Sequence, residues 1–539
     1  MKLSIDGLAE KQFWQEKGYE LPEFDIDKVS EKTEKEPIWI HFGAGNIFRG
    51  FPAVLQQSLL DKGLSDKGIM VCEAYDEEII DKVYMPFENL SILVTLKADG
   101  EMDKKVIASI TQAFKASNNM NKLSEIMTAP SLQIVSFTIT EKGYALRDSK
   151  NKYLPHIFDD LITFKKNPGS LMGKIALLCY KRYLAGKLPV AMVSMDNCSH
   201  NGEKLHQAIH TFAKFWAKEG FVENEFVDYI NNPDLVSFPW SMIDKITPRP
   251  SKKVSEVLKT DGIEDTDILK TSKNTFISSF VNAEQAQYLV IEDIFPNSRP
   301  PLEESGVIFS DRETVDKVEK MKVSTCLNPL HTILAVFGCL LGYTSISEEM
   351  KDHHLKVFIN KVGYEEGLPV VVDPGIIRPE NFIKEVIEER FPNPFVPDTP
   401  QRIACDTSQK IPIRFGETLK AYISSGTVDI SELTYIPLFF AGWLRYLIGE
   451  DDEGNTFAIS PDPMQDVLKE CMKDIKIGDE GPFTEWLKPI LSNSQIFGID
   501  LYQYGLGDKV EKLFAELIAR KGAVRKTLEK YTETEFKPV

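Results

Sequence analysis

The sequence predicts an α/β protein in which a doubly wound, mostly parallel sheet is followed by a mostly α-helical domain. A strand, a glycine-rich turn, a helix and a second strand follow one another over residues 38–72, which is the order of a βαβ unit. Short apolar runs then alternate with helical stretches, as in a parallel sheet covered by helices. Strand signals fade beyond the Pro-rich segment 295–301. We therefore expect two domains, residues 1–300 and 301–539.

Each element of this arrangement has its own signal. The first strand is predicted over residues 38–42, where apolar side chains alternate between the two faces. An apolar-periodic helix then begins near Phe51 and ends at Gly63, and the second strand covers residues 69–72. Further strands are predicted at 134–139 and 189–194. In the second domain, helical periodicity dominates residues 313–345, 347–363, 379–390, 463–475 and 506–531.

Composition excludes several classes of protein. The chain has 539 residues, 42% of them hydrophobic and 27% charged, which is typical of a globular protein with a sizeable core. It carries 63 Lys and Arg against 81 Asp and Glu, a formal charge of −18, which argues against broad nucleic-acid binding but leaves room for a local anion pocket. Seven scattered cysteines without a CxxC pair favour a reducing compartment. The longest apolar stretch, 332–343, is shorter than the roughly 20 residues that span a bilayer. We expect a soluble, cytoplasmic protein with no membrane partner.

The glycine-rich turn at 43–50 is the first motif that carries chemistry. Its glycines let the backbone approach a pyrophosphate, and a helix N-terminus supplies N–H groups there. The spacing G-x-G-x-x-x-x-G departs from GxGxxG, and a plain strand-to-helix turn is the alternative. Glu73, after the second strand, is placed to bind ribose hydroxyls, which favours NAD over NADP; a loop cap is the alternative. The predicted cofactor-binding residues are Gly43, Gly45, Asn46, Ile47, Arg49 and Glu73.

Two further motifs of the first domain contain polar residues among apolar ones. Asn197 follows the strand predicted at 189–194, at the sheet edge where doubly wound folds bind ligands, and its amide is able to donate to a developing oxyanion. An Asx turn or helix cap is the alternative for this segment. Asp244 lies inside an apolar stretch, so it requires a partner, and a pair with a lysine or a local turn satisfies that requirement equally well.

Two motifs of the second domain resemble parts of a binding site. Asn328 and His331 are three residues apart and share one face of a predicted helix, where a satisfied core network is the alternative to catalysis. Arg402 and Lys410 flank a turn, where they either bind substrate oxygens or are surface charges. No HExxH motif or Cys/His cluster at zinc spacing occurs, so we expect no metal.

Taken together and in order, these segments resemble the mannitol dehydrogenase family, the polyol-specific long-chain dehydrogenases. The resemblance runs from about residue 37 to beyond residue 410. It implies a Rossmann-type N-terminal domain, a helical C-terminal domain, and zinc-independent hydride transfer between NAD(H) and a sugar alcohol or hexuronate. The segments that carry it are FGAGNIFRG, SFTITEKGY, SMDN with its following NG, MIDKITP, VIEDIFPNSRP and the Arg402–Lys410 pair.

The resemblance also implies roles for individual residues. It makes Asn197 and Asn328 the side chains that stabilise the oxyanion. The cations Lys142, Arg402 and Lys410 would suit a substrate carboxylate. The substrate-contacting residues that it implies are His331, Asp244, Arg402 and Lys410.

The general acid/base of the family is a lysine five residues before the asparagine, a position that holds Val323 in this chain. Lys322 lies six residues before Asn328, and Lys320 lies eight before it. A single π-bulge absorbs one extra residue, and such bulges are frequent at functional sites. We therefore predict that Lys322 is the acid/base, that its pKa is lowered by its surroundings, and that the helix widens between Lys322 and Asn328.

The length and C-terminal pattern are most similar to the hexuronate branch of the family, so we expect D-mannonate/D-fructuronate oxidoreduction. The alternatives are a polyol (mannitol/fructose) dehydrogenase and an altronate/tagaturonate dehydrogenase. From other classes, an NAD-dependent sugar-acid epimerase and a non-catalytic NAD-binding module stay open. We expect a small-molecule sugar acid or polyol as partner, and a monomer or small homo-oligomer.

Overall fold

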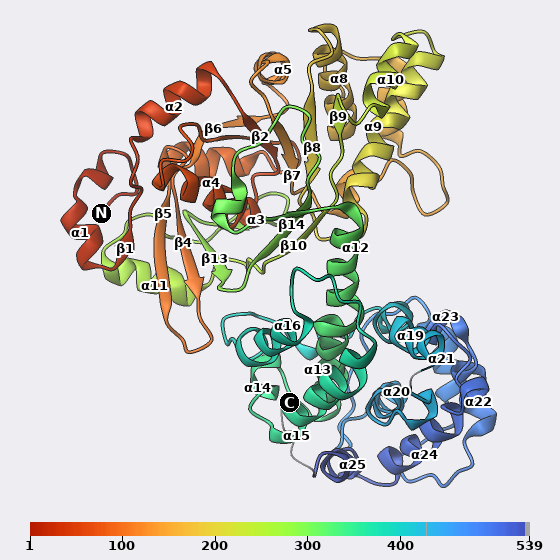
Figure 1. The fold of residues 1–539 in the computed structure, drawn as a ribbon. Helices are drawn as coiled ribbons and strands as arrows, with labels where there is room; N and C mark the ends of the chain where they lie inside the picture. Colours follow the sequence, from red (N-terminus) through yellow and green to blue (C-terminus); the bar gives the residue numbers. More distant parts are fainter. Residues whose placement is uncertain (427, 534–539) are drawn as a thin grey trace. The chain divides into compact units, whose positions relative to one another are not determined.

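The computed structural model describes residues 1–426 and 428–533, and it divides into two compact units (Figure 1). The first unit comprises Met1–Leu96 and Glu101–Asp316, and the second comprises Lys97–Gly100 and the chain from Lys317 onward. The division falls inside helix α12 (Arg312–Met321), later than the boundary expected near residue 300. The reason is strand β15 (Ile308–Ser310), which pairs in parallel with β14 (Tyr288–Glu292) and keeps this segment in the first unit.

The first unit is built on a six-stranded sheet in which every pair of neighbours is parallel. Numbered along the chain within this sheet, the strand order is 3-2-1-4-5-6, the order of dinucleotide-binding folds. The predicted doubly wound sheet is therefore confirmed, and its switch point lies between β2 and β7. In spatial order the strands are β6 (Ile110–Lys115), β3 (Ile69–Glu73), β2 (Trp39–Phe42), β7 (Ile134–Phe137), β8 (Val190–Ser194) and β9 (Val236–Ser237).

Both faces of this sheet are covered, as Figure 1 shows. Ile40 and Phe42 of β2 belong to the core on one face, whereas Trp39 belongs to the core on the other. All four residues of β2 are buried, because a parallel sheet of this kind has no solvent-facing side. Helix α4 (Pro52–Asp61) contributes to the Trp39 core. The opposite core contains residues of α5 (Met120–Thr128), α8 (Leu171–Leu184), α9 (Asn201–Lys218) and α10 (Asn224–Asn231).

Smaller sheets complete the first unit. One contains, in spatial order, β1 (Tyr19–Glu20), β5 (Met102–Ile107), β4 (Ser91–Leu96) and β13 (Phe280–Glu284). In this sheet β4 and β5 are antiparallel and the other two pairs are parallel. In another sheet, β10 (Ser241–Asp244) pairs with β14 in antiparallel orientation, and β14 pairs with β15 in parallel orientation. The remaining strands, β11 (Leu269–Lys270) and β12 (Phe276–Ile277), form an antiparallel pair.

The second unit is helical around α13 (Asn328–Leu340), which packs against α17 (Pro400–Ile403) and α20 (Tyr435–Tyr446). Every residue of α13 except Asn328 and His331 is buried. The two polar residues singled out in the sequence are therefore the ones that this helix leaves accessible. The other principal helices are α15 (His353–Asn360), α16 (Pro379–Glu385), α18 (Thr407–Ile411), α19 (Glu417–Ser425), α21 (Gln465–Met472), α22 (Thr484–Leu491), α24 (Gly507–Ile518) and α25 (Ala523–Tyr531).

The helical run from Arg312 to Leu340 has 29 residues, and an 18-residue window of it is apolar enough to match a membrane span by length and composition. Of the window, 72% is buried inside the structure, which is what the core helix of a folded unit shows. One such helix is weak evidence for a membrane.

Candidate active site

The glycine turn follows β2 at the switch point of the sheet. Gly43 has φ +110°, and a Cβ atom there would lie 2.2 Å from the carbonyl oxygen of Thr138, so the close approach of the two segments requires glycine. A Cβ atom on Gly45, by contrast, would meet nothing within 4 Å. Gly45 therefore borders open space at the start of α3 (Asn46–Gly50). This cradle fits the pyrophosphate of a dinucleotide.

Glu73 ends β3 and is buried, with both carboxylate oxygens in use. Its Oε2 accepts from the backbone N–H of Ala44 at 2.7 Å, and its Oε1 accepts from the three N–H groups of residues 74–76. It thus caps its own loop, the alternative that the sequence left open, and also ties this loop to the glycine turn. Because Oε2 has one protein partner, it retains acceptor capacity, and the ribose contact stays a prediction.

Arg49 supports the glycine turn from inside the protein. Its side chain is buried and donates to the carbonyl of Ser278 at 2.9 Å and to Oδ1 of Asn46 at 3.0 Å. Burial lowers the pKa of this guanidinium. The predicted residues Asn46 and Arg49 thus hold each other in place, and direct contact of either with a cofactor stays a prediction.

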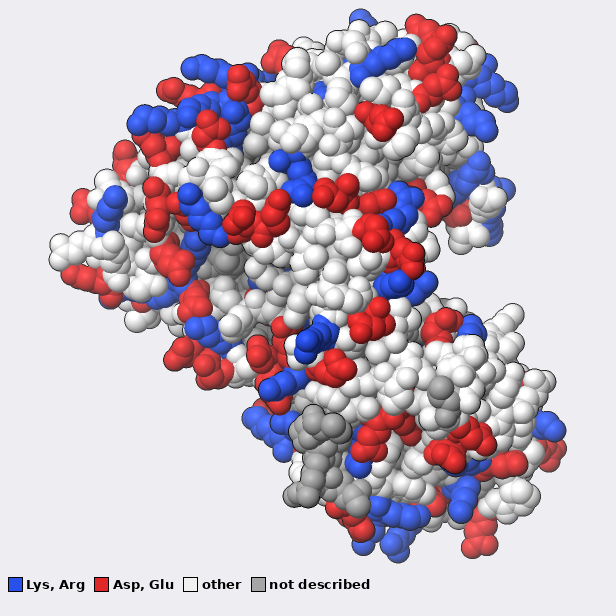
Figure 2. All heavy atoms as spheres, in the orientation of Figure 1, with Lys and Arg blue, Asp and Glu red and all other residues white. Residues whose placement is uncertain are grey.

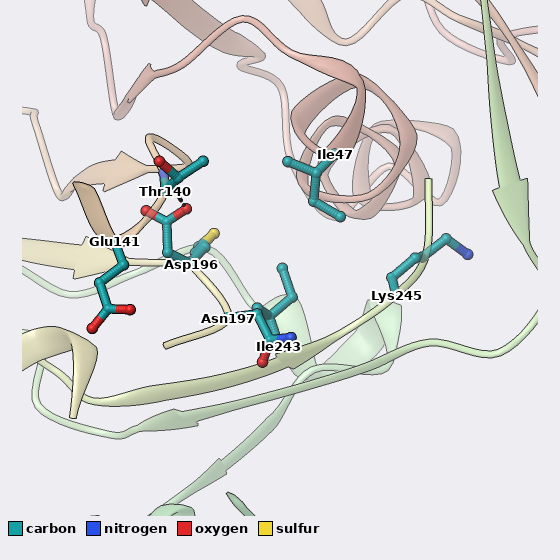
Figure 3. Close-up of a pocket in the computed structure, with 8 residues that line it drawn as sticks. Ile47, Thr140, Glu141, Asp196, Asn197, Ile243 and Lys245 are labelled. Carbon is teal, nitrogen blue, oxygen red and sulfur yellow. Dashed lines mark hydrogen bonds between the residues drawn. The ribbon is translucent and has the colours of Figure 1, made fainter. Parts of the chain in front are cut away.

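A cavity of about 260 Å³ lies at the carboxyl ends of the parallel strands. In Figure 3, Ile47 of α3 faces Asn197 and Ile243 across it. The structure therefore brings the predicted residues Ile47 and Asn197 to one pocket. Asp244 is buried at the end of β10, next to two lining residues, and Lys142 is exposed. The lining residues are Ile47, Thr140, Glu141, Met195, Asp196, Asn197, Ile243 and Lys245.

Asp196 joins two walls of this cavity, a role that the sequence analysis missed. Its carboxylate accepts from the backbone N–H groups of Ile139 at 2.9 Å and Thr140 at 2.8 Å, and from the hydroxyl of Tyr144 at 2.6 Å. Burial raises the pKa of Asp196. Thr140 has φ +64°, which is rare for a β-branched residue and persists where the surroundings impose it. The carboxylate next to Asn197 therefore fixes the loop after β7.

In the second unit, the helix that carries Lys322 widens as predicted. Residues Lys322–Cys326 form a π-helical turn, and the N–H of Leu327 donates to the carbonyl of Lys322 at 3.1 Å, five residues back. The side chain of Lys322 is buried at 4% exposure. The predicted π-bulge is confirmed, whereas the role of Lys322 as acid/base stays a prediction.

His331 lies among positive charges. Burial is the main cause of a lowered pKa of about 3 for this imidazole, and the nearby cations Arg414, Arg402, Arg390 and Lys410 add to the shift. The imidazole is therefore neutral at physiological pH. Its Nε2 atom is buried without a hydrogen bond, 3.4 Å from Oδ2 of Asp398, and contact of His331 with a substrate stays a prediction.

The structure thus groups the predicted residues His331, Arg402 and Lys410. It adds Arg390 and Arg414, which the sequence analysis had not placed in the site. Asp398, four residues before Arg402, forms an ion pair with that arginine. Among residues 1–426 and 428–533, no group of three or more His, Cys, Asp or Glu side chains is arranged to hold a metal ion.

The strand order and the glycine turn define a dinucleotide-binding protein of the Rossmann type. The model of the mannitol dehydrogenase Rossmann domain matches residues 37–304, and that of the mannitol dehydrogenase C-terminal domain matches residues 314–517. The chain belongs to the mannitol dehydrogenase family, as the resemblance implied.

Individual relatives refine this placement. The D-mannonate oxidoreductase of Thermotoga maritima is 52% identical over 534 residues, 98% of each chain. Mannitol dehydrogenase 2 of Saccharomyces cerevisiae is 30% identical over 80% of this chain and 81% of its own. The Pseudomonas fluorescens mannitol 2-dehydrogenase, solved with NAD and D-mannitol, is 26% identical with a TM-score of 0.70, covering 99% of this chain and 100% of that chain. A D-sorbitol dehydrogenase structure, 24% identical, shares the fold with a TM-score of 0.78 over 95% of this chain and 97% of its own.

Alanine substitutions at the two glycines of the turn should have different effects. Gly45→Ala has room for its methyl group in the free protein, so we expect an unchanged melting temperature but NADH binding weakened about tenfold or more, that is by about 1.4 kcal/mol. Gly43→Ala meets the Thr138 carbonyl at positive φ, so we expect destabilisation by more than about 1 kcal/mol. Fluorescence titration with NADH and thermal melting measure both. Unchanged NADH affinity in Gly45→Ala would contradict the assignment.

The neutral His331 predicts a pH-dependent stability. Its pKa is about 3 in the folded chain and near its ordinary value of 6.5 in the unfolded chain, so the unfolded state binds the extra proton between these values. The free energy of unfolding should be fully retained above pH 6.5 and fall as the pH is lowered toward 3. His41, whose pKa burial also lowers to about 3, acts in the same direction.

Thermal midpoints measured from pH 7 to pH 4.5 test this. The free energy of unfolding of His331→Gln should fall less over that range than that of the wild type. The part of the fall that is due to His41 should remain in this variant. Equal losses in the two proteins would show that His331 has no such shift.

Proposed function

We propose that this protein is an NAD-dependent dehydrogenase that interconverts a hexonate and a keto-hexuronate, with D-mannonate and D-fructuronate as the favoured pair. The observation that carries the proposal is the 52% identity, over 98% of both chains, with a D-mannonate oxidoreductase. Mannitol dehydrogenases of Saccharomyces cerevisiae, Neosartorya fischeri and Pyrenophora tritici-repentis are 30%, 29% and 28% identical to this chain. Oxidation of a neutral polyol is the second candidate, favoured by the complex of the 26% identical relative with D-mannitol.

The glycine turn fits NAD. Gly45 would lie against the pyrophosphate, because it borders open space, and Gly43 keeps the turn close to the loop after β7. Glu73 would face the ribose. Bound NAD supplies the acceptor for the hydride that leaves the alcohol carbon. The relative solved with NAD supports this choice of cofactor.

The remaining chemistry falls to side chains of the protein. Lys322 takes the hydroxyl proton during oxidation and returns it during reduction. The amides of Asn197 and Asn328 donate to the oxygen on which negative charge develops, each worth about 3 kcal/mol by analogy with other oxyanion holes. Neutral His331 offers its unpartnered Nε2 atom to a substrate hydroxyl.

The charges of the protein indicate what kind of partner it binds. The cations around His331 suit a small sugar acid, and the net charge of −18 argues against a nucleic-acid partner. On the face shown in Figure 2, positive and negative side chains are interspersed. A cytoplasmic location and a monomeric or small homo-oligomeric state stay predictions.

A substrate panel tests the proposed function. The purified protein is mixed with NAD and, separately, D-mannonate, D-altronate or D-mannitol, and NADH is followed by its absorbance. We expect the highest kcat/KM with D-mannonate, at least about tenfold above D-mannitol, because the polyol lacks the carboxylate and a lost charge-assisted contact costs about that factor. D-altronate keeps the carboxylate, so its rate tests the choice between the two hexonates. An epimerase would form no net NADH, and a binding module would turn over no substrate. Either result, or a preference for D-mannitol, would refute the proposal.

Two lysines on one helix provide a matched test of the acid/base. Lys322→Ala should lower kcat about 10²- to 10⁴-fold while NADH affinity changes by less than about twofold, because the lysine moves a proton and does not hold the cofactor. Lys320→Ala is the control, since Lys320 is exposed two residues earlier. Lys322→Met, which keeps more of the buried volume, separates lost chemistry from lost folding. Near-normal kcat in both Lys322 variants, or a loss confined to Lys320→Ala, would overturn the assignment.

A further inference from the structure

Arg414 contacts the first turn of α13 through one edge of its guanidinium group. It lies in the π-helical turn Pro412–Gly416, and its Nη1 atom donates to the carbonyl of Asn328 at 3.3 Å and to the hydroxyl of Thr332. Both acceptors are neutral oxygens, and they flank His331 in the sequence. Arg414 is therefore anchored to the segment that carries the predicted substrate contacts.

The other edge of this guanidinium is available to a ligand. Within residues 1–426 and 428–533, the Nε and Nη2 atoms of Arg414 donate to no protein atom. This edge of an arginine holds a carboxylate through two parallel hydrogen bonds. Because no carboxylate of the described chain pairs with Arg414, its charge is held there by neutral groups alone, and burial lowers its pKa to about 10.

Lys410 is close to Arg414 and has similar surroundings. Its ammonium group donates to the carbonyl of Ile403 at 2.9 Å, a third neutral oxygen. Burial lowers the pKa of Lys410, and Arg414 lowers it further, whereas Asp406 raises it to a smaller extent. Arg402, by contrast, already has a carboxylate partner in Asp398. Half-buried cations held by neutral acceptors favour the binding of an anion.

We propose that Arg414 and Lys410 form a subsite for the carboxylate of the substrate, and that Arg414 makes this site prefer a hexonate to a neutral polyol. The inference rests on the proposed function and extends it to one residue. Arg402 and Lys410 are implied for the family as a whole, so they do not by themselves separate acids from polyols. Arg414 adds its Nε and Nη2 atoms, which are able to donate two parallel hydrogen bonds to a carboxylate. The hydroxymethyl group that a polyol has at this position does not accept such a pair of bonds.

The experiment compares Arg414→Gln with the wild type on D-mannonate, D-mannitol and D-mannitol 1-phosphate. We expect KM for D-mannonate to rise about 10- to 100-fold with a much smaller change in kcat, as for loss of a charge-assisted contact. The kinetic constants for D-mannitol should change by less than about threefold; where its turnover is too slow, its inhibition constant against D-mannonate is measured. Lys420→Gln removes an exposed cation of α19 that pairs with Glu417, and is the matched control.

The outcomes separate this inference from the proposed function. A wild type that prefers D-mannitol or D-mannitol 1-phosphate to D-mannonate refutes both. A wild type that prefers D-mannonate, together with an Arg414→Gln variant that keeps its KM or loses activity equally on acid and polyol, refutes the subsite alone. If Arg414→Gln does not fold, Arg414→Lys retains the charge without the bidentate edge, and its KM for D-mannonate should still rise about tenfold. An unchanged KM in that variant would overturn the proposal.

Discussion

One surplus residue between Lys322 and Asn328 sets the geometry of the site in the helical unit. The N–H of Leu327 bonds to a carbonyl five residues back, so the helix turns less per residue and six residues cover the rotation of five. Lys322 therefore lies on the same side of the helix, relative to Asn328, as a lysine five residues before that asparagine would in a regular α-helix. The rest of α13 is buried, so the polar residues at its start are held by the surrounding core.

In the first unit, the equivalent constraint is the close approach of two loops at the switch point of the sheet. Gly43 lies against the carbonyl of Thr138, and the loop after β7 is held a second time by Asp196 through Ile139, Thr140 and Tyr144. The cavity that Asn197 lines therefore has walls fixed by the Asp196 carboxylate and by the close approach of Gly43 to Thr138. Each unit thus presents polar groups on a rigid frame, which catalysis by positioned donors requires.

Features carried by local periodicity and spacing were predictable from the sequence. The parallel sheet followed from alternation around the glycine turn. The π-bulge followed from the resemblance, because Lys322 lies six residues before Asn328 and the lysine of the family lies five before its asparagine. The sequence did not decide between a ribose contact and a loop cap for Glu73, because both roles need a carboxylate at the end of the same strand. The contacts of Asp196 and of Arg414 were not predictable, since they join segments 52 to 86 residues apart. Pairing of β15 with β14 likewise moved the boundary beyond residue 300.

Deleting Val323 tests most directly whether the widened helix positions the acid/base. The deletion removes the surplus residue, restores a regular α-helix and leaves the lysine five residues before the asparagine. Steady-state kinetics with D-mannonate and NAD should then give a kcat within about tenfold of the wild type, whereas inserting one further alanine at this point should abolish turnover, because proton transfer needs hydrogen-bond reach. A folded deletion variant without activity, or a fully active insertion variant, would contradict the account.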